Sequence, residues 1–206
     1  MARLSGTEGY GETAHVLVEQ YEKLTFDEVH GDLLHLFPAA PARVLDIGAG
    51  TGRDAAALAG LGYSVVAVEP TAEMRAIGQR LHASEPIDWI DDGLPDLAHA
   101  RATGKTFDLV LLTAVWMHLD AEQRERAMPA VASLMHPGGV MKLSLRHGPI
   151  PAGRRMFDFS ADETSTLAGR HGLTVVHHKA RKSLSHAADV RWDVLVFRYC
   201  GSPSTA

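Results

Sequence analysis

Residues 43–52, with the sequence RVLDIGAGTG, decide the fold of this 206-residue chain. The first five positions place aliphatic residues around one aspartate, which predicts a buried strand. Three glycines at alternate positions then allow a tight turn, and residues 53–58 continue with a helical pattern. A strand, a glycine turn and a helix in this order direct backbone amides toward a ligand. We therefore expect a ligand site at this turn.

The rest of the chain alternates short β-branched runs with amphipathic segments, which predicts an α/β fold with helices on both faces of a parallel sheet. Strands are predicted at residues 43–47, 64–68, 87–90, 108–113, 140–145, 174–178 and 190–199. Helices are predicted at residues 54–58, 72–81, 121–135 and 161–168, with two further helical pieces within residues 12–36. No convincing helix separates the last two strands, so we expect them to form an antiparallel pair at the sheet edge.

The spacing and charge of the glycine turn narrow the class of ligand. Its pattern, Gly48-x-Gly50-x-Gly52, differs from the dinucleotide fingerprint G-x-G-x-x-G, and it lacks the Gly-Lys-Ser/Thr ending of a phosphate-binding P-loop. Asp46 precedes the turn, where a carboxylate repels a pyrophosphate but suits an ammonium group. Glu69 follows the second strand, where a carboxylate accepts hydrogen bonds from two ribose hydroxyls. These residues favour S-adenosylmethionine over NAD, which stays open as an alternative.

Composition excludes several classes of protein. The chain has 46% hydrophobic and 22% charged residues and a formal net charge of -5, which is typical of a globular domain and argues against a nucleic-acid partner. The lone Cys200 forms no intramolecular disulfide, and the first residues lack the apolar run of a signal peptide. No apolar run approaches the roughly 20 residues of a membrane span. We expect a cytoplasmic protein without a membrane partner, and its oligomeric state stays undetermined.

Several motifs occur in the order found in one enzyme family. The glycine turn at residues 44–52 is followed by Glu69, by residues 91–94 (DDGL), by residues 107–112 (FDLVLL) and by residues 135–139 (MHPGG). In this order the sequence resembles the class I S-adenosylmethionine-dependent methyltransferases, particularly small bacterial members that act on metabolites. The last motif departs from the family's L-x-P-G-G only in its first residue, which is methionine here. The resemblance covers residues 44–145.

The resemblance implies a fold and a domain plan. The fold is a Rossmann-like, doubly wound sheet of seven strands in the order 3-2-1-4-5-7-6, with strand 7 antiparallel and a helical N-terminal cap. The whole chain, residues 1–206, is then a single methyltransferase domain. Residues 1–40 form the cap, residues 41–200 the core and residues 201–206 a tail.

The resemblance also implies S-adenosylmethionine as the cofactor, with S-adenosylhomocysteine as its product. The backbone around Gly48 and Gly50 would hold the methionine portion, Glu69 the ribose, and Asp91 or Asp92 with Gly93 the adenine. Met74 packs either on the adenine or simply in the core, and the two aspartates have solvation as their alternative role. The full predicted cofactor set is Asp46, Gly48, Ala49, Gly50, Gly52, Glu69, Pro70, Met74, Asp91, Asp92, Gly93, Thr113 and Ala114.

The predicted acceptor site lies where strands 4 and 5 end. Trp116 would stack on a planar acceptor, and His118 would act as the catalytic base that removes a proton from the nucleophile. Both also have a purely structural interpretation. Arg146 with Arg154 or Arg155 would clamp a carboxylate or phosphate. The predicted substrate-binding residues are Tyr21, Trp116, His118, Arg146 and Arg154, while Tyr10 is an alternative to Tyr21 for the methionine carboxylate.

The sequence predicts no metal site, although it contains twelve histidines. His177 and His178 are adjacent on a predicted strand and must point to opposite faces, and no Cys-x-x-Cys motif occurs. We therefore expect methyl transfer by in-line displacement to a small-molecule acceptor. A methyltransferase acting on RNA or protein, a noncatalytic S-adenosylmethionine-binding module and an NAD-dependent oxidoreductase remain the alternatives.

Overall fold

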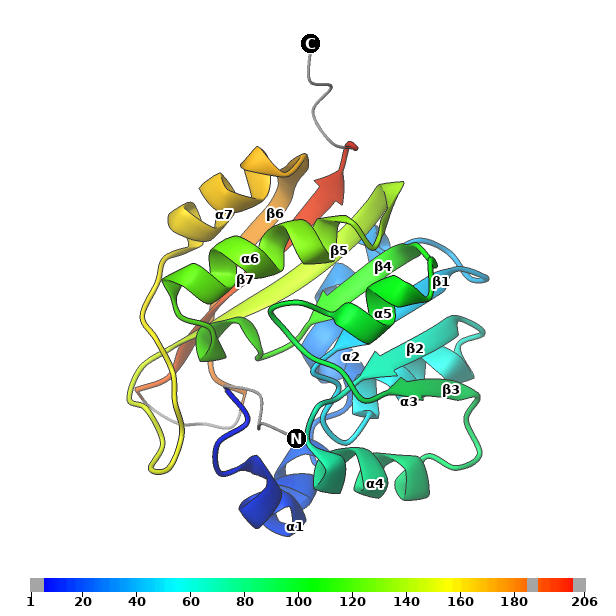
Figure 1. Ribbon diagram of the computed structural model, residues 1–206. Helices are drawn as coiled ribbons and strands as arrows, with labels where there is room; N and C mark the ends of the chain where they lie inside the picture. The colour runs from blue at the N-terminus through cyan, green and yellow to red at the C-terminus, as the bar shows by residue number, and fades with distance from the viewer. Residues whose placement is uncertain (1–5, 185–188, 202–206) are drawn as a thin grey trace.

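The computed structural model describes residues 6–184 and 189–201, and within them a seven-stranded sheet forms the centre of the molecule (Figure 1). The strand order is β3-β2-β1-β4-β5-β7-β6. Strand β7 runs antiparallel to both β5 and β6, and the other pairings are parallel. The strands are β1 (Arg43–Ile47), β2 (Ser64–Val68), β3 (Ile87–Ile90), β4 (Phe107–Leu112), β5 (Met135–His147), β6 (Leu173–Lys182) and β7 (Arg191–Tyr199). The predicted order and the antiparallel final pair are confirmed.

Helices cover both faces of this sheet (Figure 1). Side chains alternate between the faces along each strand, and each face has its own apolar core. Leu45 and Val110 pack with α6 on one face, whereas Val44 and Leu109 pack with α3 on the other. The helices are α1 (Tyr10–Tyr21), α2 (Phe26–His30), α3 (Arg53–Gly60), α4 (Ala72–Leu81), α5 (Ala98–Ala102), α6 (Ala121–Ala132) and α7 (Ala161–Arg170), with 3-10 helices η1 (Gly31–Leu36) and η2 (Trp116–His118).

Several element boundaries differ from the sequence prediction. Strand β5 begins at Met135, so residues 133–135, which were expected in a helix, lie outside α6. Strand β6 runs to Lys182, four residues beyond the expected end, because it stays paired with β7 as far as Arg191. Helix α5 was not predicted; it is five residues long and follows Asp92, whose side chain accepts a hydrogen bond from the backbone of Ala100. Apart from Gly201, the predicted tail lies outside the described residues.

The N-terminal segment and the loop after β5 close over the carboxyl ends of the strands. Arg154 in that loop donates hydrogen bonds to the carbonyl oxygen of Glu8 at 3.0 Å and to the hydroxyl of Thr13 at 2.9 Å, and its guanidinium stacks on the Tyr10 ring. The first helix lies beside α4 (Figure 1). These contacts place a helical cap over the edge at which doubly wound sheets bind ligands. In residues 6–184 and 189–201, no helix is long and apolar enough to cross a membrane.

Candidate active site

A pocket of about 670 Å³ lies between the carboxyl ends of the strands and the N-terminal cap. Its volume is in the range of small-molecule and cofactor sites. The pocket is lined by most of the residues that the sequence predicted for the two ligands. These are Asp46, Gly48, Ala49, Gly50, Glu69, Pro70, Met74, Gly93, Thr113 and Ala114 from the cofactor set, and Tyr21, His118, Arg146 and Arg154 from the substrate set.

The glycine turn has a backbone that only glycine adopts without strain at two pocket positions. Gly48 and Gly50 have φ values of 70° and 60°, in the left-handed region. A Cβ atom at Gly48 would lie 2.6 Å from a methyl carbon of Val115. The Gly48 amide donates to the Val68 carbonyl at 2.8 Å, which ties the turn to β2. The missing side chains leave the turn's backbone accessible from the pocket.

The carboxylate of Glu69 is fixed by two backbone amides. One of its oxygens accepts a hydrogen bond from Gly50 at 2.8 Å, and the other accepts one from Thr71 at 2.7 Å. Burial raises the pKa of this carboxyl above its ordinary value, and the two amide hydrogen bonds oppose that increase. Because a carboxylate oxygen accepts more than one hydrogen bond, both oxygens keep acceptor capacity toward the pocket.

His118 is held in one tautomer at the other end of the pocket. Its Nδ1 lies 2.8 Å from the carbonyl oxygen of Arg155, which only accepts hydrogen bonds, so Nδ1 carries the proton. Its Nε2 therefore accepts the hydrogen bond from the Tyr10 hydroxyl at 2.9 Å. Burial lowers the pKa of His118 below the ordinary histidine value. The ring is thus a neutral base whose Nε2 lone pair accepts a hydrogen bond from the Tyr10 phenol.

Comparison with known proteins identifies this arrangement. A family model described as a methyltransferase domain matches residues 44–139, the segment from the glycine turn to the start of β5. Residues 44–139 thus form a methyltransferase domain, and the sheet that contains them has the strand order of the class I S-adenosylmethionine-dependent methyltransferases. An uncharacterized methyltransferase of Mycobacterium tuberculosis is 35% identical over 115 residues, which are 52% of this chain and 41% of that protein. The demethylmenaquinone methyltransferase of Clavibacter sepedonicus is 30% identical over 125 residues, 59% of this chain and 48% of that protein.

Solved structures share the fold of this methyltransferase domain. The 1,6-didemethyltoxoflavin-N1-methyltransferase of Burkholderia thailandensis superimposes with a TM-score of 0.71 at 22% identity, covering 91% of this chain and 84% of that one. The magnesium protoporphyrin IX methyltransferase of Synechocystis, with bound S-adenosylmethionine, has a TM-score of 0.68 at 17% identity, covering 93% and 84%. The chain spans about half or less of the length of the curated relatives it matches, between 41% and 54%.

The cofactor of this domain type is S-adenosylmethionine, and the pocket fits that molecule. Its glycine turn exposes backbone, and the fixed Glu69 carboxylate suits a pair of ribose hydroxyls. Ala114 also lines the pocket, with a left-handed φ of 61°. Its amide donates to the Ser144 hydroxyl at 2.9 Å, which stabilises this strained residue at the end of β4.

Four predicted site residues lie outside the pocket lining: Gly52, Asp91, Asp92 and Trp116. Gly52 is the N-cap residue of α3 and packs against Trp89, where a Cβ atom would lie 2.7 Å from the indole. Asp91 pairs with Arg75 at 2.9 Å, and its side chain is 61% exposed. Asp92 is buried and accepts hydrogen bonds from the amides of Gly93 and Ala100, so its side chain organises the turn into α5.

The position of Trp116 differs from the prediction that its side chain forms an aromatic wall of the substrate site. Its side chain is fully buried in the apolar core between the sheet and α6. The 3-10 helix η2 turns the chain between Trp116 and His118, so the indole faces the core while the imidazole faces the pocket. In this structure Trp116 packs in the core and does not line the pocket.

Two arginines of the predicted clamp have other partners. Arg154 lines the pocket, but its guanidinium binds the cap as described above. Arg155 pairs with Asp120 at 2.9 Å and does not line the pocket. The structure therefore does not form the predicted clamp of Arg146 with either arginine.

A buried group of charged side chains beneath the glycine turn was missed from the sequence. Lys142 on β5 is completely buried and lies 3.4 Å from the Thr113 hydroxyl. Desolvation lowers the pKa of Lys142 to about 8, although Asp54 opposes this shift. Asp54 also accepts a hydrogen bond from the buried His30 at 2.8 Å. The one available signal was a lysine in the middle of an apolar strand.

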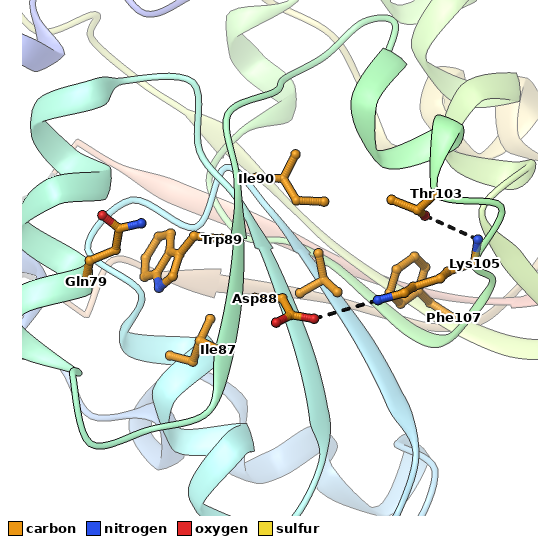
Figure 2. A pocket seen from close by; sticks show the side chains of 9 residues that line it. Gln79, Ile87, Asp88, Trp89, Ile90, Thr103, Lys105 and Phe107 are labelled. Atoms are coloured by element: carbon orange, nitrogen blue, oxygen red, sulfur yellow. Dashed lines mark hydrogen bonds and ion pairs between the residues drawn. The ribbon is translucent and has the colours of Figure 1, made fainter.

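A second hollow, of about 410 Å³, lies beside the edge strand β3 (Figure 2). Lys105 extends toward Asp88, 3.7 Å away, and both side chains are more than half exposed. This hollow contains none of the residues predicted for the two ligands. Within the described parts of the chain, no group of three or more His, Cys, Asp or Glu residues is arranged to hold a metal ion.

Proposed function

We propose that the whole protein transfers the methyl group of S-adenosylmethionine to a small-molecule acceptor bound in the same pocket. The observation that carries this proposal is that one pocket joins the glycine turn and Glu69 to the His118–Tyr10 pair. A noncatalytic S-adenosylmethionine-binding module needs the glycine turn and Glu69 to hold the ligand. It does not need a fixed, neutral base such as His118. The geometry therefore favours an enzyme.

In this proposal the cofactor occupies the end of the pocket formed by β1, β2 and β4. Asp46 and the backbone of Gly48, Ala49 and Gly50 lie against the methionine portion. Glu69 accepts the ribose hydroxyls, and Pro70, Met74 and Gly93 surround the adenine. Thr113, Ala114 and Tyr21 lie between the two ends of the pocket. All of these residues line it.

The bound cofactor supplies an activated methyl group, which the acceptor's nucleophile takes as the carbon–sulfur bond breaks. The protein aligns the nucleophile and removes its proton. His118 Nε2 accepts that proton, either directly or through the Tyr10 hydroxyl that already donates to it. The Arg155 carbonyl keeps Nδ1 protonated and then stabilises the imidazolium that forms. The cap, fastened by Arg154, excludes water from this end.

The cap also supports a small acceptor over RNA or protein. Helix α1 and the segment before it lie over the pocket, with Gly6 packed against the His118 side chain. A polymer would have to displace these contacts to reach His118. The net charge of -5 also opposes RNA binding.

Calorimetry and methyl transfer together test the proposal. We expect S-adenosylmethionine and S-adenosylhomocysteine to bind and NAD to give no heat. Methyl-labelled S-adenosylmethionine is then incubated with the protein and either a bacterial small-molecule extract or the matching RNA and protein fractions. Label is expected in small molecules. NAD binding without a response to the other two ligands would contradict the cofactor assignment, and label only in a macromolecular fraction would contradict the acceptor assignment.

A further inference from the structure

Three side chains of the pocket lie in one row across neighbouring strands. Arg146 on β5 is paired with Trp192 on β7, and Trp192 is paired with Arg181 on β6. Residues directly opposite each other in paired strands project from the same face of the sheet. All three line the pocket. The row thus presents two guanidinium groups on either side of one indole ring to the bound molecules.

Within residues 6–184 and 189–201, the two arginines have no carboxylate partner. Among the described residues, no Asp or Glu oxygen lies within 4.0 Å of the Arg146 or Arg181 guanidinium. In the described part of the chain, the polar contacts of Arg146 are a long one of 3.5 Å to the Gly148 carbonyl and one to the Met156 sulfur. Arg181 donates to the Val29 carbonyl at 3.1 Å, and its Nε is buried without a hydrogen-bond partner in the described structure.

A nearby acid does not neutralise this row. Asp32 lies close enough to influence Arg181, but its carboxylate pairs with Lys179 at 2.8 Å. Desolvation lowers the pKa of both Arg146 and Arg181, as expected for cations with reduced access to water. Partly buried cations without a counterion are unfavourable unless a ligand supplies the charge. An anion in the pocket would satisfy both groups.

We propose that the Arg146–Trp192–Arg181 row binds an oxyanion, a carboxylate or a phosphate, carried by the methyl acceptor, with the apolar part of the acceptor against Trp192. This rests on the proposed function, since it assigns the acceptor to that same pocket. The arginine fork forms paired hydrogen bonds with oxyanions, and an indole presents a flat apolar surface. Met156 and Leu184 extend the apolar wall. The acceptor class is therefore a small anionic molecule with an apolar body.

Labelled transfer tests this proposal directly. The full-length protein is incubated with methyl-labelled S-adenosylmethionine and a small-molecule extract, and the products are separated by anion exchange before and after phosphatase treatment. We expect anionic labelled products. Loss of retention after phosphatase would identify a phosphate, and unchanged retention a carboxylate. Neutral or cationic products would overturn the proposal while leaving methyl transfer to a small molecule intact.

Arginine variants separate binding of the acceptor from binding of the cofactor. R146Q and R181Q are each expected to lower kcat/KM for the purified acceptor roughly 10- to 150-fold, the loss of a charged hydrogen bond, mainly through KM. S-adenosylhomocysteine affinity, measured by calorimetry, should stay unchanged, which also shows that the variants fold. R146K should recover part of the loss. The matched control, R101Q, changes an exposed arginine on α5 and should behave as the unmodified protein.

Two outcomes separate this inference from the proposed function. Undiminished kcat/KM in both glutamine variants would overturn the anion site alone. Absence of any labelled small molecule, despite binding of S-adenosylmethionine, would contradict the proposed function and this inference with it.

Discussion

The two ends of the pocket are built in different ways. At the cofactor end, the site is formed largely by backbone groups. Gly48 and Gly50 expose the main chain, and backbone amides fix the Glu69 carboxylate. At the acceptor end, side chains from remote segments meet, as where the Tyr10 hydroxyl bonds His118, 108 positions along the chain. Backbone recognition changes little when side chains are substituted. The comparison teaches that single substitutions should alter specificity at the end proposed for the acceptor.

The largest expected effect is that of replacing His118, which should slow methyl transfer without changing the affinity for the cofactor. H118A should lower kcat by about 10²- to 10⁴-fold, the usual contribution of a general base, and leave S-adenosylmethionine affinity unchanged. Because burial lowers the pKa of His118, activity in the unmodified protein should fall on acidification at a lower pH than an ordinary histidine would give. Single-turnover methyl transfer measured against pH checks both points. H136A, which removes an exposed imidazole, is the control, and unchanged turnover in H118A would restore a structural role for His118.

The buried charges beneath the cofactor end should make the fold sensitive to acid. Desolvation lowers the pKa of His30 to about 4 in the folded protein, whereas an unfolded histidine titrates near 6.5. Between these values the unfolded state binds a proton that the folded state does not, so the free energy of unfolding falls as pH falls. Across this pH interval the free energy of unfolding should fall by about 3 kcal/mol. Urea unfolding from pH 7 to pH 4 measures it.

The H30Q variant isolates this contribution. Its glutamine does not titrate, so its free energy of unfolding should depend less on pH in the same interval, whatever its absolute stability. Asp54, Arg53 and Lys142 face His30 and remain in both proteins. Parallel pH dependences for the two proteins would show that His30 is not the responsible group.

A smaller effect should be confined to cofactor binding. E69Q replaces an oxygen acceptor with an amide that opposes the Gly50 or Thr71 amide, and it should weaken S-adenosylmethionine binding by about 1.5–3 kcal/mol. The acceptor's KM, at saturating cofactor, should stay unchanged. Calorimetry measures the affinity, and E122Q, on the exposed surface of α6, provides the control. An unchanged affinity for S-adenosylmethionine would show that Glu69 does not bind the cofactor.

The smallest expected effect concerns the cap. R154Q removes two hydrogen bonds and a stacking contact that join the loop after β5 to the N-terminal segment. Each hydrogen bond contributes on the order of 1 kcal/mol, so the loss of both should make the amides of α1 exchange with solvent up to roughly 30-fold faster. R155Q, which loses a partly exposed ion pair with Asp120 and a stacking contact with Phe157, is the matched control. Equal exchange in the two variants would show that Arg154 does not fasten the cap.

The fold was largely predictable because local patterns determined it. The glycine turn, the apolar strands and the missing helix between β6 and β7 indicated an α/β sheet with an antiparallel pair at its edge, and the resemblance to the methyltransferase family supplied the strand order that the structure has. Helix α5 was not, since it has five residues and depends on the Asp92 side chain for its start. A short element whose stability comes from one tertiary hydrogen bond leaves little periodicity in the sequence.

The acceptor end was less predictable for a geometric reason. Trp116 and His118 are two positions apart, and only the observed 3-10 turn shows which of them faces the core. The Arg146–Trp192–Arg181 row depends on the register of three strands and on the extension of β6 beyond residue 178. No local motif contains that register. The charged side chain of Lys142 beneath Thr113 was hidden for the same reason.

The two outer strands of the sheet have a consequence for self-association. An edge strand offers unpaired backbone groups to a second copy of the chain, and short length or charged residues oppose such pairing. Strand β3 has only four residues and carries Asp88. Strand β6 is longer, but it carries Lys179, Arg181 and Lys182, and Lys179 reaches across to Asp32. Both edges thus discourage strand-to-strand aggregation while the sheet stays open.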